Sequence, residues 1–198
     1  MTGTVSSRRR AAIACAIACA ILLGERAAIA QKKFLIFGDS KVSYTTFRDM
    51  AGRFELEYPT KDWGSFPPGG STIAILSRND KTATVVIDHS RLTEPLAPQE
   101  ITTNAKIEID NLKEQQPNAK GFTSELLDCK AGSGSLIRYS RAGARGPERV
   151  MRYSVGVDKD LYRLDAVVAE ASLARFEPIL MHMIQSFKAP AGPVTSKN

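Results

Sequence analysis

The order of strand-like and helix-like hydrophobic patterns along the chain constrains its fold more than any other feature of the sequence. Period two, which is typical of half-buried strands, comes first and predicts strands at 53–59, 71–76 and 82–88. A turn-rich loop is expected at 62–70, and the tight turn at 79–81 favours a hairpin between the second and third strands.

A helical period follows at 98–116, where Pro98 suits the first turn of a helix. Strands are then predicted at 122–129, 135–139, 149–157 and 161–169. A short turn at 158–160 favours a hairpin between the last two. A second helical period covers 172–187, and Pro178 within it marks either a kink or the first turn.

In this order, strands outnumber helices, and tight turns join two pairs of strands. Strands joined by tight turns are antiparallel, whereas an alternating βαβ fold places a helix after almost every strand. We therefore expect an α+β fold in which helices sandwich an antiparallel β-sheet.

The first thirty residues have the pattern of a signal peptide. Three arginines at 8–10 precede an apolar run at 11–23, which is too short to span a bilayer. Ala28-Ile29-Ala30 fits a small-residue cleavage site. We expect residues 1–30 to be removed, leaving a periplasmic or secreted protein without a transmembrane segment.

An envelope-tethered lipoprotein is the alternative, because Cys15 and Cys19 lie within the apolar run. Lipid attachment usually requires Leu or Val three residues before the cysteine. Ala12 and Ala16 occupy those positions, so the pattern favours cleavage without lipid attachment.

Cleavage would lower the formal net charge from +6 to +3, because four arginines and one glutamate leave with the signal peptide. A charge of that size gives no indication of nucleic-acid binding. One cysteine, Cys129, would remain and could form no internal disulfide. We expect it to be a packed, unreactive thiol, with a reactive or intermolecular thiol as the alternative.

The remaining chain is long enough for one domain with its own core. We expect an N-terminal arm or linker at 31–50, a folded domain at 51–188 and a disordered tail at 189–198. The arm contains Phe-Leu-Ile-Phe-Gly-Asp-Ser at 34–40, which resembles the way serine hydrolases of the GDSL class present their nucleophile. A small serine esterase that uses Ser40 is therefore one hypothesis for function.

The rest of the sequence does not supply the partners that Ser40 would need. Hydrolases of this class use a downstream glycine and asparagine for the oxyanion, and a base histidine preceded three residues earlier by aspartate. The nearest match to the first block, at 78–80, lacks the glycine, and Ile179 stands three residues before His182. The sequence therefore predicts no catalytic residue.

Metal and cofactor sites are not predicted either. His89, His182 and Cys129 do not lie at ligand spacing, and the acidic residues form no calcium loop. His182 points away from the apolar stripe of its helix, which predicts a solvated side chain. His89 shares a strand face with apolar residues and is expected to be semi-buried, opposite the face of Asp88.

Four arginines flank the loop at 142–147, and a fifth lies within it. If the strands on either side pair as a hairpin, their guanidinium groups should gather at one end of the sheet. They would then form either a solvated edge protected by charge or a patch for an acidic protein or an anionic lipid surface. These residues are Arg138, Arg141, Arg145, Arg149 and Arg152.

Several packing motifs are shared with a known family. They are Arg-Phe-Glu-Leu-Glu-Tyr-Pro at 53–59 with Asp-Trp at 62–63, Gln-Gln-Pro at 115–117, Asp-Leu-Tyr-Arg-Leu at 160–164 and Ile-Gln-Ser-Phe at 184–187. Together they resemble the PsbP-like family, which is named after an extrinsic protein of photosystem II and includes envelope proteins of non-photosynthetic bacteria.

This resemblance covers about residues 51–188. It implies an antiparallel sheet between helices and a non-enzymatic role, and it carries over no catalytic residue or cofactor. We therefore expect a secreted, non-catalytic binding or assembly-accessory module. Its expected partner is an unknown envelope protein or an anionic surface.

Overall fold

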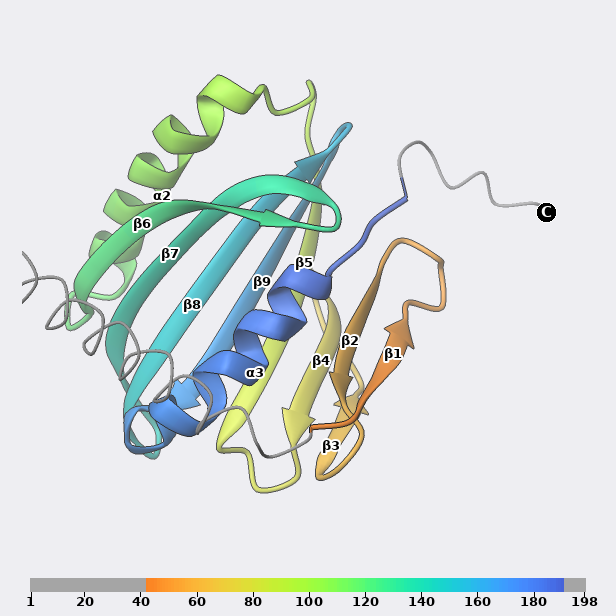
Figure 1. Cartoon of the computed structure of the whole chain (residues 1–198). Helices are drawn as coiled ribbons and strands as arrows, with labels where there is room; N and C mark the ends of the chain where they lie inside the picture. The colour runs from red at the N-terminus through yellow and green to blue at the C-terminus, as the bar shows by residue number, and fades with distance from the viewer. Residues whose placement is uncertain (1–41, 191–198) are drawn as a thin grey trace, which may run out of the picture. The chain divides into compact units, whose positions relative to one another are not determined.

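The computed structural model describes residues 42–190, and Figure 1 shows their arrangement. The elements are β1 (Tyr44–Arg48), β2 (Glu55–Pro59), β3 (Trp63–Phe66), β4 (Thr72–Arg78), β5 (Ala83–Arg91), α2 (Ile101–Gln115), β6 (Lys120–Cys129), β7 (Gly132–Gly143), β8 (Gly146–Val157), β9 (Asp160–Ala169) and α3 (Leu173–Ser186). Short 3₁₀ turns at Pro98–Glu100 and Glu170–Ser172 lead into α2 and α3. Pro178 lies inside α3 and is therefore not in its first turn.

The main sheet is antiparallel throughout, with the strand order β3-β4-β5-β9-β8-β7-β6. The predicted hairpins are confirmed, because β4 pairs with β5 and β8 pairs with β9. The long-range pairing of β5 with β9, in which Val85 lies opposite Ala166, joins the two halves of the chain. The two runs of predicted strands thus form one sheet.

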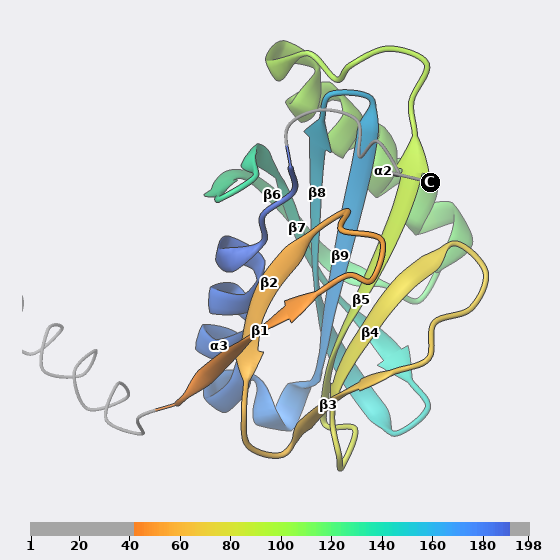
Figure 2. The same cartoon turned by 90° about the vertical axis from the view of Figure 1, so that its right-hand side faces the viewer.

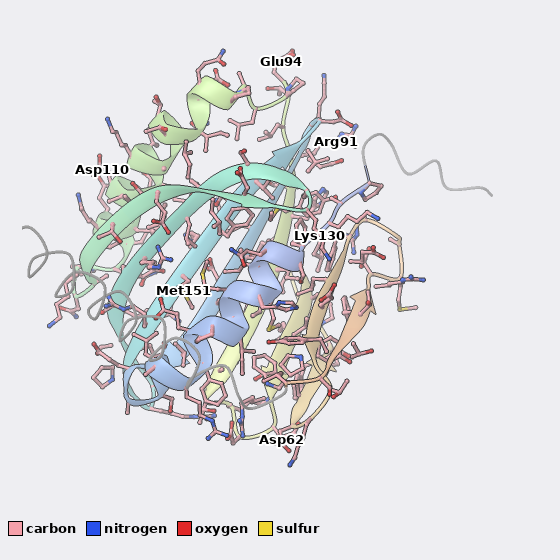
Figure 3. All side chains as sticks on the ribbon, in the orientation of Figure 1. Asp62, Arg91, Glu94, Asp110, Lys130 and Met151 are labelled. Atoms are coloured by element: carbon pink, nitrogen blue, oxygen red, sulfur yellow. The ribbon has the colours of Figure 1, made fainter. Side chains whose placement is uncertain are left out.

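The two helices cover opposite faces of this sheet (Figure 2). On the α3 face, Met151, Tyr153 and Leu164 are fully buried against the helix, and Figure 3 shows Met151 between β8 and α3. The α2 face carries a smaller cluster, consisting of Ala105, Leu112, Ile137, Tyr139 and Val150. Alternate residues of each strand therefore serve two cores. The predicted α+β sandwich is confirmed.

Two short strands lie where no strand is expected from the sequence. β1 falls inside the segment 31–50, which is expected to be an arm, and it pairs with β2 so that Phe47 lies opposite Leu56. β3 falls inside the expected loop and brings Trp63 into the core at 9% exposure. Neither strand alternates apolar and polar residues, so its sequence shows no clear period.

The packed part of the chain extends one residue beyond the expected domain boundary at 188. Lys188 exchanges two backbone hydrogen bonds of 2.8 Å with Glu55 of β2, and Ala189 is buried. The segments 1–30 and 191–198 and the Ser40 motif lie outside the described residues. Within 42–190, none of the helices is long and apolar enough to cross a membrane.

Candidate functional site

A cavity of about 250 Å³ lies between α2, the loop after β5 and the α2 face of the sheet. It combines apolar walls with polar groups, as ligand sites in proteins usually do. The lining residues are Leu92, Leu96, Ile101, Asn104, Ile107, Glu108, Asn111, Ser135, Ser154, Leu161 and Arg163.

Small side chains on two neighbouring strands create this space. Ser135 of β7 lies directly opposite Ser154 of β8. Further along the same strands, Ile137 and Val150 fill the gap beneath α2. Serine side chains are too short to do so, and the cavity therefore opens where the helix passes over them.

The outer wall is held in place by the loop between β5 and α2. Leu96 of this loop packs so closely on β8 that a Cβ added to Gly156 would lie 2.9 Å from the Leu96 Cβ. The Leu92 N–H donates to the Lys159 carbonyl at 2.7 Å, and the Ala97 N–H donates to Glu100 Oε2 at 3.0 Å. Both ends of the loop are anchored, so the wall is formed without a ligand.

Four charged side chains form a network beside the cavity. The Arg152 guanidinium donates to both Asp165 oxygens, at 2.7 and 2.6 Å, and to Glu108 Oε1 of α2 at 3.3 Å. Burial is the largest single effect and lowers the pKa of Arg152. The hydrogen bonds to Asp165 and the charge interactions with Asp165, Tyr139 and Glu108 together outweigh burial and raise this pKa above its usual range. The Ser154 hydroxyl donates to Glu108 Oε2 at 3.2 Å, which places this carboxylate firmly at the cavity edge.

Arg163 contributes the second guanidinium of the network. Its Nε lies 2.9 Å from Glu108 Oε1, but the N–H does not point at the oxygen, so the contact is an ion pair without a hydrogen bond. Within residues 42–190, the Arg163 guanidinium makes no hydrogen bond, although it lines the cavity. Its Nε is buried against Glu108, so only the Nη donors can reach a ligand in the cavity.

The Ser135 hydroxyl is a second available group. The residue is only 4% exposed, and its side chain makes no hydrogen bond within the described part of the chain. Its oxygen is not one of the fully buried polar atoms that lack a partner among the described residues, so it stays accessible from the cavity. Asn104 and Asn111 of α2 also line the cavity, and each adds an amide that can donate and accept.

The five arginines selected from the sequence do not form one surface. β7 and β8 pair as expected, but strand alternation puts Arg138 and Arg149 on the α3 face and Arg141 and Arg152 on the α2 face. Arg145 lies at the hairpin turn, where its Nη1 donates to the Asp80 carbonyl at 2.9 Å. The expectation that all five gather at one end of the sheet is therefore corrected.

Carboxylates neutralise three of these arginines. Arg138 pairs with Glu125 at 2.5 Å, Arg141 pairs with Glu148 at 3.0 Å, and Arg152 pairs with Asp165. Arg149 donates to the Ser140 hydroxyl at 3.0 Å. Binding of an anionic partner at these residues stays a prediction.

The two histidines each contact a carboxylate. His182 of α3 is not simply solvated, because the β1–β2 ribbon packs beside it: its Nε2 lies 2.9 Å from Glu57 Oε2, and its ring centroid lies 4.0 Å from that of Tyr44. His89 is half-buried, and its Nε2 lies 3.0 Å from Asp160 Oδ1. Both histidines therefore join distant segments of the fold.

Cys129 is half-buried and accepts hydrogen bonds from the Tyr153 hydroxyl at 3.1 Å and the Ala131 N–H at 3.3 Å. In residues 42–190, His, Cys, Asp and Glu side chains do not gather in groups of three or more that could hold a metal ion. Ser40 lies outside the described residues, but the antiparallel sheet differs from the parallel sheet of GDSL hydrolases.

Sequence reasoning does not find Glu108, Ser135 or Arg163 as members of a site. The available signal is a polar face on alternate residues of the β8 and β9 strands, opposite their apolar face. Such a face usually lies in solvent, so only its cover by α2 distinguishes it.

Comparison with solved structures identifies the type of fold. Cyanobacterial PsbP from Synechocystis superposes with a TM-score of 0.59 and 13% identity, over 77% of this chain and 96% of that one. The fold is PsbP-like. LpqN, described as involved in cell envelope biogenesis of Mycobacterium tuberculosis, shares the PsbP-like fold with a TM-score of 0.54 and 15% identity, over 78% of this chain and 95% of that one.

The Ran-binding protein Mog1p of Saccharomyces cerevisiae shares it as well, with a TM-score of 0.53 and 10% identity, over 75% of this chain and 96% of that one. The sequence matches no family model and no curated protein. At these identities the likeness is one of fold, and the resemblance inferred from the packing motifs is confirmed at that level.

Proposed function

We propose that the protein is a non-catalytic binding or assembly-accessory module of the bacterial cell envelope. Its partner would be an envelope protein or an anionic surface. The observation that carries the proposal is a preformed cavity whose neighbouring charges are satisfied by one another. Glu108 is held by Arg152, Arg163 and Ser154, so it is not free to act as a base for a nucleophile.

The PsbP-like fold supports the same proposal. Mog1p is described as Ran-binding, and LpqN is described as involved in cell envelope biogenesis. Neither description names an enzymatic activity. The fold thus occurs in proteins with different binding or assembly roles, and the site of each protein must decide its partner.

The signal-peptide pattern at 1–30 supports a periplasmic or secreted location. Mass spectrometry of the protein from an envelope fraction tests this. We expect a mature chain that begins at Gln31. A chain that begins at Cys15 or Cys19 and carries lipid mass would favour the tethered form, and an uncleaved cytoplasmic chain would contradict the proposal.

The esterase hypothesis is tested with a fluorophosphonate probe, which labels activated serines. We expect no labelling of the purified mature protein. Labelling that disappears in Ser40→Ala would overturn the non-catalytic proposal.

Partner capture tests the binding role directly. Asn104 and Thr103 are adjacent exposed residues of α2, and only Asn104 lines the cavity. Asn104→Trp should therefore block the cavity, whereas Thr103→Trp adds the same side chain elsewhere. We expect an envelope component that cross-links to the wild type and to Thr103→Trp, but less to Asn104→Trp. Equal recovery with all three proteins would place the binding surface outside the cavity.

A further inference from the structure

The cavity under α2 has unused polar groups, apolar walls and no unbalanced charge. From these three features we infer that it binds a small, short-chain aliphatic molecule with an uncharged amide-like head group. This inference rests on the proposed binding function and adds a small-molecule ligand, held in the same cavity, to the envelope partner proposed above.

The size of the cavity limits the ligand. A cavity of about 150 Å³ is sufficient for benzene. The cavity here is about 250 Å³, which suits a chain of roughly six carbons with a small polar head. A long acyl chain would extend beyond it.

The walls favour an aliphatic chain. Leu96 and Leu161 are partly buried, and Ile101 is buried at the start of α2. Ile107 is 53% exposed, which makes it one of three exposed large hydrophobic residues among the described ones. A chain lying beside Ile107 would remove apolar surface from water, at about 25 cal/mol per Å².

The polar groups favour a head that both donates and accepts. The Arg163 guanidinium offers donors to a carbonyl oxygen, and the Ser135 hydroxyl can accept from an N–H. The amides of Asn104 and Asn111 can do either. A primary amide has the donors and the acceptor that satisfy these groups together.

The charge network disfavours ionic heads. Glu108 and Asp165 balance Arg152 and Arg163, and each has an oppositely charged partner within 3.3 Å. A carboxylate or ammonium head would lose its hydration without gaining an unpaired counter-charge, and burial of such an ion is unfavourable. An uncharged head avoids this penalty.

Three probes that share a six-carbon chain test the inference: hexanamide, hexanoate and hexylamine. Each is titrated into the ¹⁵N-labelled mature protein, and amide shifts are followed. We expect hexanamide to shift residues that line the cavity and to bind at least fivefold more tightly than hexanoate or hexylamine. Tighter binding of either charged probe, or no saturable shift with hexanamide, would overturn the inference.

Variants locate the binding. Asn104→Trp should abolish saturable binding of hexanamide, and Thr103→Trp should leave it within twofold of the wild type. Ser135→Ala should weaken it at least threefold, whereas Ser65→Ala, at an exposed position on β3, should not. Unchanged binding in Asn104→Trp would show that the probe binds elsewhere and would overturn the assignment.

The same samples separate this inference from the proposed function. Hexanamide that binds and persists supports both. Conversion of hexanamide and water to hexanoate and ammonium would contradict the non-catalytic proposal but would agree with the inferred ligand class. If hexanamide showed no saturable binding but partner capture succeeded, only the inferred ligand class would be contradicted.

Discussion

Arg152 and Asp165 lie directly opposite each other on β8 and β9, and the guanidinium group donates to both carboxylate oxygens. Their side chains are 15% and 18% exposed, so the pair is largely removed from water. Removal of one partner leaves a buried charge unpaired. We expect Arg152→Met to lower the free energy of unfolding by about 3 kcal/mol, measured by urea denaturation.

Two control variants test whether the loss of stability in Arg152→Met comes from breaking the buried ion pair. Arg141→Met breaks the Arg141–Glu148 pair, which is more exposed at 34% and 22%, and should lower stability by less than about 1 kcal/mol. The double variant Arg152→Met, Asp165→Leu should recover much of the loss, because no charge of this pair is left unpaired. A loss below about 1 kcal/mol in Arg152→Met alone would contradict the argument.

The β1–β2 ribbon is attached to α3 by an aromatic contact. Tyr44 packs on His182, whose ring also hydrogen-bonds to Glu57 of β2. Such ring pairs contribute about 0.5–1.5 kcal/mol. We expect Tyr44→Ala to lower stability by about 1 kcal/mol and to increase hydrogen exchange at the amides of β1. Thr46→Ala, at an exposed position on the same strand, should leave exchange unchanged; equal exchange in both variants would refute the role of Tyr44.

The outer wall of the cavity depends on a glycine. At Gly156 a Cβ would lie 2.9 Å from the Leu96 Cβ, whereas at Gly64 it would meet no atom within 4 Å. Gly156→Ala should therefore displace the loop after β5 and lower stability by about 1–2 kcal/mol. Gly64→Ala should change it by less than about 0.5 kcal/mol. Thermal unfolding compares the two, and an equal effect would show that the loop accommodates the added carbon.

The parts of the fold that depend on residues close together in the sequence were predictable. The hairpins β4–β5 and β8–β9 follow from strand period and turn residues, and both helices follow from their apolar stripes. The pairing of β5 with β9 brings together segments about eighty residues apart, and period alone does not specify such a contact. β1 and β3 are stabilised by contacts with the rest of the fold, so their short sequences carry little signal.

The candidate site was less predictable, because it depends on what the polar face of the sheet meets. Ser135 and Ser154 form the cavity only because they lie opposite each other beneath α2. For the arginines, in contrast, the sequence predicted a cluster that the fold does not form. Their spacing around one loop predicted a cluster, but strand alternation sends Arg138 and Arg141 to opposite faces. Register and layer order, which require the whole fold, decide both outcomes.

The hydrogen bonds of Asp80 predict how the stability of the fold changes at low pH. Its carboxylate accepts hydrogen bonds from the side chain and backbone of Thr82 and from Arg78, and these lower the pKa of Asp80 from 3.8 to about 2. A carboxyl group whose pKa is depressed by folding stabilises the folded state above its unfolded pKa. That contribution is lost as the pH falls through the folded value.

Asp80→Asn should therefore be less stable than the wild type by a constant amount above about pH 5. The difference should narrow as the pH falls from about 4 to about 2, because protonation of Asp80 then removes the same interaction from the wild type. Urea denaturation of both proteins across this range measures the difference directly. A difference that is independent of pH would show that the hydrogen bonds of Asp80 do not require its charge.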